Sequence, residues 1–190
     1  MNMLHKIISI AALTSPLMVY AFPIATSGEG LRVLVNKQGI VNATYKGNSA
    51  AYSNDLYLVT NDGVANNDVF IFNNHSSAVE STVNLGSFAA NTELIFRLHV
   101  NNTNRDYFSG DAARNPDNHA HARVQQNYGV NTSLLSFEDL YNGPFNYNDL
   151  SFTFSNTATV IQPSSVAEPI STLLLFFGLA SLAVARRRKI

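Results

Sequence analysis

Cysteine is absent from this chain of 190 residues, so no disulfide bond contributes to its stability. The folded state must therefore be stabilised by other means, and we expect these to be a hydrophobic core and a metal bound through other side chains. Basic residues are also few in the body of the chain, residues 22–165, where seven Lys and Arg stand against twelve Asp and Glu. A net charge of −5 disfavours nucleic acid as a partner and suits hard cations instead.

The chain also lacks the local motifs of the common enzyme classes. No Gly-x-Ser-x-Gly elbow, His-Glu-x-x-His pair, phosphate loop or dinucleotide fingerprint occurs. Glu138 and Asp139 are sequence neighbours, and neighbours on a strand face opposite ways, so we do not expect them to act as an acid and a base on one substrate. We predict that the protein is not an enzyme.

Helical periodicity and internal repeats are missing from the body as well. Apolar residues alternate with period two instead, and clusters rich in Asn, Gly and Ser separate the runs. The runs are Leu31/Val33/Val35, Leu56/Leu58, Val69/Ile71, Leu94/Phe96/Leu98/Val100 and Leu150/Phe152/Phe154. This pattern predicts an all-β domain over residues 22–165, an antiparallel β-sandwich or jelly roll. Segments 55–60 and 68–72 are apolar on both faces and are predicted to be central strands, joined by a turn at 61–63.

The N-terminus has the order of a secretion signal. His5 and Lys6 precede an apolar run over residues 7–19, and small residues lead to a cleavage site after Ala21. Pro16 interrupts this run, which argues against a core helix of the folded domain. We predict a signal helix within a cleavable signal peptide, residues 1–21, and therefore export from the cytoplasm through the secretion machinery.

The C-terminus, residues 166–190, contains three modules in a fixed order. A short motif ending in Glu168-Pro169 is followed by an apolar stretch over residues 170–185 and then by a basic cluster. A helix over 170–185 would rise ~24 Å against a hydrocarbon core of ~30 Å, so this transmembrane helix is a marginal anchor. The basic cluster resists translocation and predicts an N-out, C-in topology. Its residues are Arg186, Arg187, Arg188 and Lys189.

This tail resembles the PEP-CTERM sorting signal, in which a Pro-Glu-Pro-like motif, a short membrane helix and a basic cluster follow one another. Glu168-Pro169 match the motif, whereas Ala167 stands where the family often has its first proline. The resemblance implies recognition by an exosortase-type transpeptidase, cleavage near the motif, and transfer to the cell surface or release. An ordinary C-terminal anchor would have the same topology without processing.

Oxygen-bearing side chains concentrate in residues 137–150, on both sides of a Gly-Pro turn. The turn brings together two groups, Glu138 and Asp139 on one side and Asn146, Asn148 and Asp149 on the other. Repulsion among three carboxylates favours a bound cation, and Ca²⁺ fits such oxygen ligands better than Mg²⁺ does. The alternative is a solvated acidic turn whose side chains only cap backbone N–H groups.

The region over residues 93–154 is similar to a domain of unknown function that recurs in PEP-CTERM and bacterial surface proteins. The motifs that match are Ser109-Gly110, Arg114-Asn115-Pro116-Asp117, His121-Ala122, Phe137-Glu138-Asp139-Leu140 and Tyr147-Asn148-Asp149. The chain departs at Asn146, where that family usually has Asp. The resemblance implies a β-sandwich with a calcium site, in which Glu138, Asp139, Asn148 and Asp149 are ligands and Asp117 contributes.

His119 and His121 lie two residues apart, the spacing of one strand face, which would suit a transition metal. No cysteine or nearby glutamate completes a zinc site, so we expect a hydrogen-bonded histidine that supports the acidic turn.

Together these features predict a non-catalytic, calcium-stabilised protein of the cell surface or of an exopolysaccharide and biofilm matrix. The alternative is a lectin-like carbohydrate-binding module, because Tyr107, Tyr128, Tyr141 and Tyr147 could stack on sugar rings.

Overall fold

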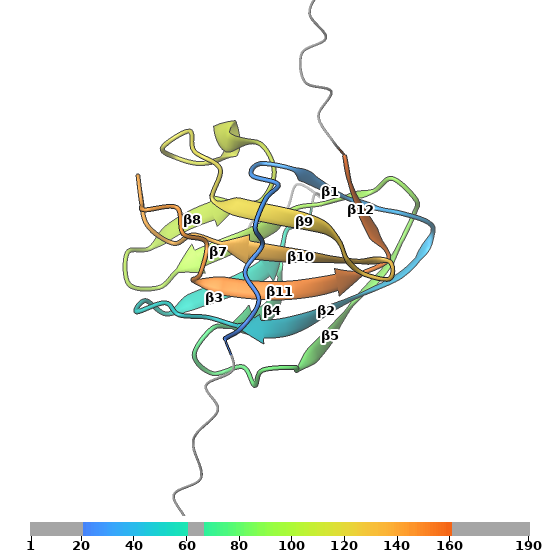
Figure 1. Cartoon of the computed structure of the whole chain (residues 1–190), viewed down its shortest axis with the longest axis horizontal. Helices are drawn as coiled ribbons and strands as arrows, with labels where there is room; N and C mark the ends of the chain where they lie inside the picture. Colours follow the sequence, from blue (N-terminus) through green and yellow to red (C-terminus); the bar gives the residue numbers. More distant parts are fainter. Residues whose placement is uncertain (1–20, 61–66, 161–190) are drawn as a thin grey trace, which may run out of the picture.

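The computed structural model describes residues 21–60 and 67–160, and within them the protein is all-β with antiparallel sheets (Figure 1). The predicted signal peptide up to residue 20, the turn predicted at 61–63 and the predicted sorting tail lie outside these residues. Within the described residues, one short 3₁₀ helix, η1 (Ala112–Arg114), lies in the loop between strand β8 (Arg105–Phe108) and strand β9 (Ala122–Gly129).

Strands of the described residues form three sheets. The five-stranded sheet has the order β5 (Thr82–Phe88), β2 (Gly39–Gly47), β11 (Leu150–Ser155), β10 (Thr132–Phe137), β9 (Ala122–Gly129). The four-stranded sheet has the order β4 (Val69–Asn73), β3 (Asn54–Leu58), β7 (Phe96–Val100), β8 (Arg105–Phe108). The three-stranded sheet has the order β12 (Thr157–Val160), β1 (Arg32–Val35), β6 (Glu93–Leu94).

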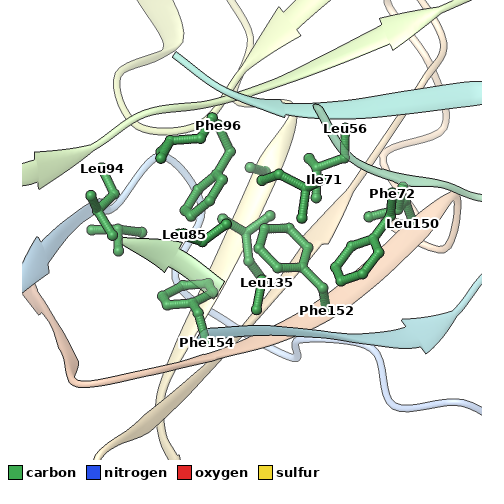
Figure 2. Packing of buried hydrophobic residues seen from close by; sticks show 14 of the residues in the cluster. Leu56, Ile71, Phe72, Leu85, Leu94, Phe96, Leu135, Leu150, Phe152 and Phe154 are labelled. Atoms are coloured by element: carbon green, nitrogen blue, oxygen red, sulfur yellow. The ribbon is translucent and has the colours of Figure 1, made fainter. Parts of the chain in front are cut away.

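The core lies between the five-stranded and the four-stranded sheet (Figure 2). Phe96 of β7 packs edge-on against Phe152 of β11, with ring centroids 4.9 Å apart, and also contacts Phe154. Tyr45 of β2 contacts Phe72 of β4 with the two rings tilted by 36° and their centroids 5.6 Å apart. Two antiparallel sheets that share one apolar core are consistent with a β-sandwich.

Strand β2 follows the predicted period of two, since buried and half-buried residues alternate along it from Val41 to Gly47. Strand β11 does not, because all its residues from Leu150 to Phe154 are buried. The reason is a segment of chain over residues 22–30, which we call the N-terminal strap, that crosses the outer face of this sheet (Figure 1). Its Ala25 N–H donates to Ser136 Oγ, which in turn is 2.8 Å from Ser151 Oγ.

Two strand predictions are wrong. The segment 68–72 was expected to be central, but β4 is an edge strand, and Val69 and Phe70 are exposed on it. The single run over residues 94–100 divides between β6 and β7, which belong to different sheets. Alternation in the sequence predicts on which face of a sheet each side chain lies, but it does not show which strands pair with one another.

Candidate cation site

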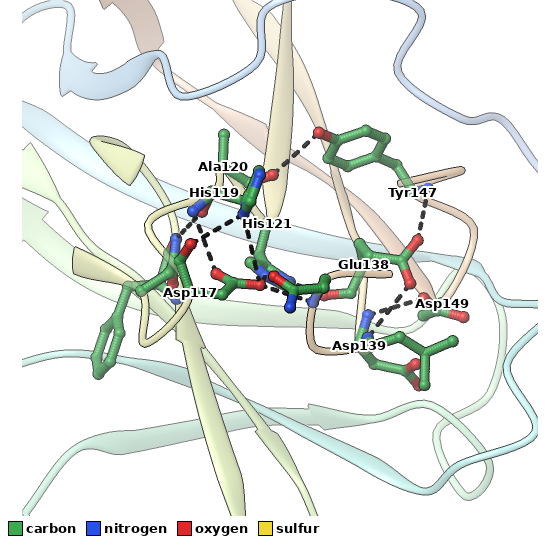
Figure 3. Close-up of polar contacts among 12 residues, drawn as sticks. Asp117, His119, Ala120, His121, Glu138, Asp139, Tyr147 and Asp149 are labelled. Carbon is green, nitrogen blue, oxygen red and sulfur yellow. Dashed lines mark hydrogen bonds and ion pairs between the residues drawn. The ribbon is translucent and has the colours of Figure 1, made fainter. Parts of the chain in front are cut away.

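Three acidic side chains gather where β10 ends and β11 begins. Glu138 and Asp139 follow Phe137, the last residue of β10, and Asp149 precedes Leu150, which pairs with Phe137 in the antiparallel register. One oxygen from each of the three carboxyl groups lies within 4.8 Å of the others. The three residues are only 1%, 4% and 7% exposed. The two halves of the predicted acidic turn are therefore brought together (Figure 3).

The expectation that Glu138 and Asp139 face opposite ways is wrong. It assumed a continuous strand, but β10 stops at Phe137, so strand alternation does not apply to the next two residues. Both carboxyl groups belong to the same cluster.

Glu138 organises the acidic loop, which we define as residues 138–149. Its Oε1 accepts the N–H of Leu140, and its Oε2 accepts those of Asn146 and Tyr147, at 3.2, 3.0 and 3.4 Å. These bonds hold a backbone with positive φ at Phe145 and Tyr147, which bulky residues rarely adopt. The Glu138 carboxylate thus fixes the shape of the loop that closes the cluster.

Gly143 lies against this carboxylate. A Cβ atom at that position would come within 2.7 Å of the Leu140 carbonyl oxygen and 2.8 Å of Glu138 Oε1. Real side chains do not tolerate such contacts, so the loop requires glycine here.

Asp139 and Asp149 connect the two larger sheets. Asp149 Oδ2 accepts the N–H of Asp139 at 2.9 Å, while Asp139 Oδ2 accepts the side-chain amide of Asn54, at the start of β3, at 2.8 Å. Asn54 is completely buried, and its Oδ1 has no hydrogen-bond partner in the described part of the chain. An orphaned buried oxygen is costly unless something binds it.

Burial disfavours the charged form of each carboxyl group in the cluster. Burial, with the negative charge of Asp139 adding to it, raises the pKa of Asp149 to about 7. Burial also raises the pKa of Asp139, although the Asn54 amide opposes the shift. Burial raises the pKa of Glu138 as well, although three backbone N–H groups that donate to its carboxylate oppose the shift. Without a cation, the cluster does not carry its full negative charge at neutral pH.

Asp117 lies outside the cluster and supports it through His121. The buried His121 ring bonds the Glu138 carbonyl oxygen through Nδ1 and Asp117 Oδ2 through Nε2, both at 2.9 Å (Figure 3). Burial opposes ionisation of Asp117, but the Asn142 N–H and His121 bring its pKa down to about 2. Asp117 is therefore an anion with partners of its own, which makes it a poor ligand for a cation at the cluster.

The remaining predicted ligands are placed differently. The hydrogen bonds of Asn148 run through its backbone, whose carbonyl oxygen accepts the N–H of Ser49 at 2.7 Å. His119 is exposed and bonds the Asp117 carbonyl oxygen. No group of three potential metal-binding side chains in the described residues includes a histidine.

Asn54 is the residue that sequence reasoning missed. It is 85 residues from Asp139 in the chain, and nothing near it marks it as different from the other asparagines. An all-oxygen set of three carboxyl groups and a nearby amide oxygen fits a hard cation such as Ca²⁺. Of the predicted ligands, Glu138, Asp139 and Asp149 meet in this cluster, Asp117 does not belong to it, and the hydrogen bonds of Asn148 involve only its backbone.

Comparisons with protein-family models, with curated proteins and with solved structures find no match. Among the residues that the structure describes, no helix has the length and apolar character needed to cross a membrane. The apolar stretch over 170–185 is not among them.

Proposed function

We propose that this chain is a non-catalytic, exported surface or matrix protein whose β-sandwich is stabilised by a calcium ion at Glu138, Asp139 and Asp149. The observation that carries the proposal is the burial of three carboxyl groups within 4.8 Å of one another, beside the unpartnered Oδ1 of Asn54. A cation would offset the repulsion among the carboxylates and give the amide oxygen a partner.

A structural role fits this geometry better than catalysis does. Glu138 is 1% exposed, and both its oxygens already accept backbone N–H groups of the acidic loop. Such a carboxylate is poorly placed to exchange a proton with a substrate, because its position is fixed and covered. The ion would instead join the end of β10 to the start of β11 and, through Asn54, to β3.

Export and sorting belong to the same proposal and rest on the terminal segments. A protein delivered outside the cytoplasm meets millimolar calcium in many environments, at which a site of modest affinity is filled. The PEP-CTERM-like tail would hold the chain at the membrane until an exosortase-type enzyme processes it near Glu168-Pro169.

The test is thermal unfolding of the full chain in mild detergent, followed by circular dichroism in EDTA and in millimolar calcium. A cation bound only by the folded state adds ~2.7 kcal/mol at a hundredfold excess over Kd, which corresponds to a rise in Tm of roughly 5–15 °C. Magnesium should reproduce little of this rise, because it demands a strict octahedron.

Asp149→Asn should remove the calcium response without lowering Tm in EDTA, because the amide oxygen can still accept the Asp139 N–H. The control is Asp111→Asn, the same change at an exposed residue that caps η1. Equal melting temperatures in EDTA and in calcium for the unmodified chain would disprove the calcium site. The acidic side chains would then only cap backbone N–H groups of the loop.

A further inference from the structure

A pair of adjoining hollows lies beside the acidic loop, at the edge formed by β8. One, of about 310 Å³, is lined by Tyr52, Tyr107, Asp139 and Tyr141 among others, and the second, of about 570 Å³, by Arg105, Asp106 and Arg114 among others. Both are also lined by Arg105 and Tyr141, so they are parts of one groove. Their volumes lie within or near the range of about 300–1,000 Å³ that is typical of small-molecule sites.

Arg105 gives the groove a cation that is not used elsewhere. Its guanidinium lies over the Tyr141 ring, 4.5 Å from the centroid, and forms no ion pair within residues 21–60 and 67–160. Most other cations of the described chain are paired, as Arg114 is with Glu93. Asp106, the acidic residue of the larger hollow, is already bound by Arg97 and His99.

A second feature of the groove is the hydroxyl group of Tyr107, which lies near Arg105. The residue is 0% exposed, and its ring stacks on His121 with centroids 3.8 Å apart, which fixes its position. Its oxygen is buried beside the smaller hollow and makes no hydrogen bond of normal geometry among the described residues. Burial raises the pKa of Tyr107, and the nearby Arg105 guanidinium opposes that rise, so the two groups face the same space. A buried hydroxyl group without a partner is rare, and a ligand in the hollow would supply one.

We infer that this groove binds an acidic sugar residue of a polysaccharide, with the carboxylate on Arg105, the ring against Tyr141 and a sugar hydroxyl on Tyr107. Tyr141 is 45% exposed, so it offers ring surface to the C–H face of a pyranose. Because the body carries a net negative charge, it does not attract anions in general. We therefore assign the attraction for the sugar carboxylate to Arg105.

The residues proposed to hold the sugar are not calcium ligands. Asp139 is the one calcium ligand that lines the groove, and it has no role in holding the sugar. Binding of the sugar does not depend on a bound ion. Asp139 lies at the tyrosine-lined hollow, whereas Arg105 reaches both hollows, so the sugar carboxylate can pair with Arg105 on the side away from Asp139.

The test is isothermal titration of the full chain, in mild detergent and EDTA, with a galacturonic acid oligosaccharide. Its methyl ester is the matched ligand control, because it keeps the ring and loses the charge. We expect the acid to bind and the ester to bind at least about tenfold more weakly, the loss typical of a charge-assisted hydrogen bond.

The variants are Arg105→Gln, Tyr107→Phe and the control Lys37→Gln. Arg105→Gln should weaken binding about tenfold, and Tyr107→Phe should weaken it several-fold without lowering Tm, because it removes a buried hydroxyl that has no partner. Lys37 is exposed in the turn between β1 and β2, across the molecule from β8 (Figure 1), so its variant should bind as the unmodified chain does.

Four results would overturn the inference. They are no binding in EDTA, equal binding of acid and ester, an Arg105→Gln variant that binds normally, and equal binding of polyglutamate, which would assign the groove to acidic peptides. Binding that appears only with calcium and ignores Arg105 would place the sugar on the metal instead. A failed calcium response in the melting experiment leaves this result unaffected, so the two proposals fail separately.

Discussion

Among single residues, Gly143 is the one at which the acidic loop has no room for a side chain. Gly143→Ala should destabilise the protein by about 1–3 kcal/mol, because the new Cβ would press on the Leu140 carbonyl and on the Glu138 carboxylate. Urea unfolding followed by circular dichroism measures the change. Gly129→Ala is the control, since a Cβ there meets nothing closer than 3.6 Å, and it should be neutral or slightly stabilising.

Asp149 makes stability depend on pH. Its pKa is about 7 in the folded protein and 3.8 as an unperturbed group, so the folded state retains a proton that the unfolded chain loses between these values. In EDTA the free energy of unfolding should therefore fall as the pH rises from about 4 to 7, by up to about 4 kcal/mol, and then level off.

Calcium should reverse this trend, because it binds the ionised carboxylates. The stabilisation by calcium is expected to be larger at pH 8 than at pH 5. Urea unfolding at a series of pH values, with Asp149→Asn as the control, measures both effects. A variant whose pH dependence in EDTA matches that of the unmodified chain would show that another group is responsible.

The residues of the cluster differ in how far sequence could identify them. Glu138, Asp139 and Asp149 lie on two sides of one Gly-Pro turn, so local spacing predicts their approach. Asn54 joins them only because β3 begins beside the loop in the folded molecule, and local spacing contains no such information. Asp117 was misjudged because the sequence does not show that His121 and the Asn142 N–H already bind it.

At the scale of elements, the N-terminal strap is as important as a strand. Ser136→Ala should cost about 1–3 kcal/mol, because it leaves the buried Ala25 N–H without an acceptor and also removes the contact with Ser151. Urea unfolding measures the loss. Ser87→Ala, on an exposed position of β5, should change stability by less than about 0.5 kcal/mol. Similar values for the two variants would mean that the strap is not docked in solution.

The strap also explains which elements sequence reasoning could predict. The alternation in β2 and the interleaved Ser and Thr of β11 predict strands with one solvent-facing side. The side facing away from the core in β11 is buried instead, because a segment without regular structure covers it. A covering segment of this kind has no periodic signal, so its position follows only from the tertiary structure.

At the scale of the whole molecule, the predictions for the body and for the two ends rest on different kinds of sequence signal. The all-β class followed from composition and period, whereas the division into three sheets depends on long-range pairing that no local pattern specifies. The ends were interpreted from the order of their modules, and their residues lie outside those that the structure describes.

Processing is the prediction that belongs to the whole chain. In cells with an active exosortase, the mature protein should start at Phe22 and lack residues 173–190, and deletion of the enzyme should leave the tail attached. Intact-mass spectrometry measures both ends. Replacing Glu168-Pro169 by Ala-Ala should block removal of the tail, whereas the same change at Gln162-Pro163 should not. A tail that persists in cells with the enzyme would indicate a simple anchor.

Strand β1 pairs along its whole length with β12, so the first and the last strand of the described chain are neighbours. The strap adds a contact that spans 111 residues, from Ala25 to Ser136. Contacts so distant in sequence form slowly, and these cannot form until nearly all of the body has emerged from the ribosome. Slow completion of the fold is compatible with the export that we propose, because a chain without its final contacts can still pass through a secretion channel in an extended form.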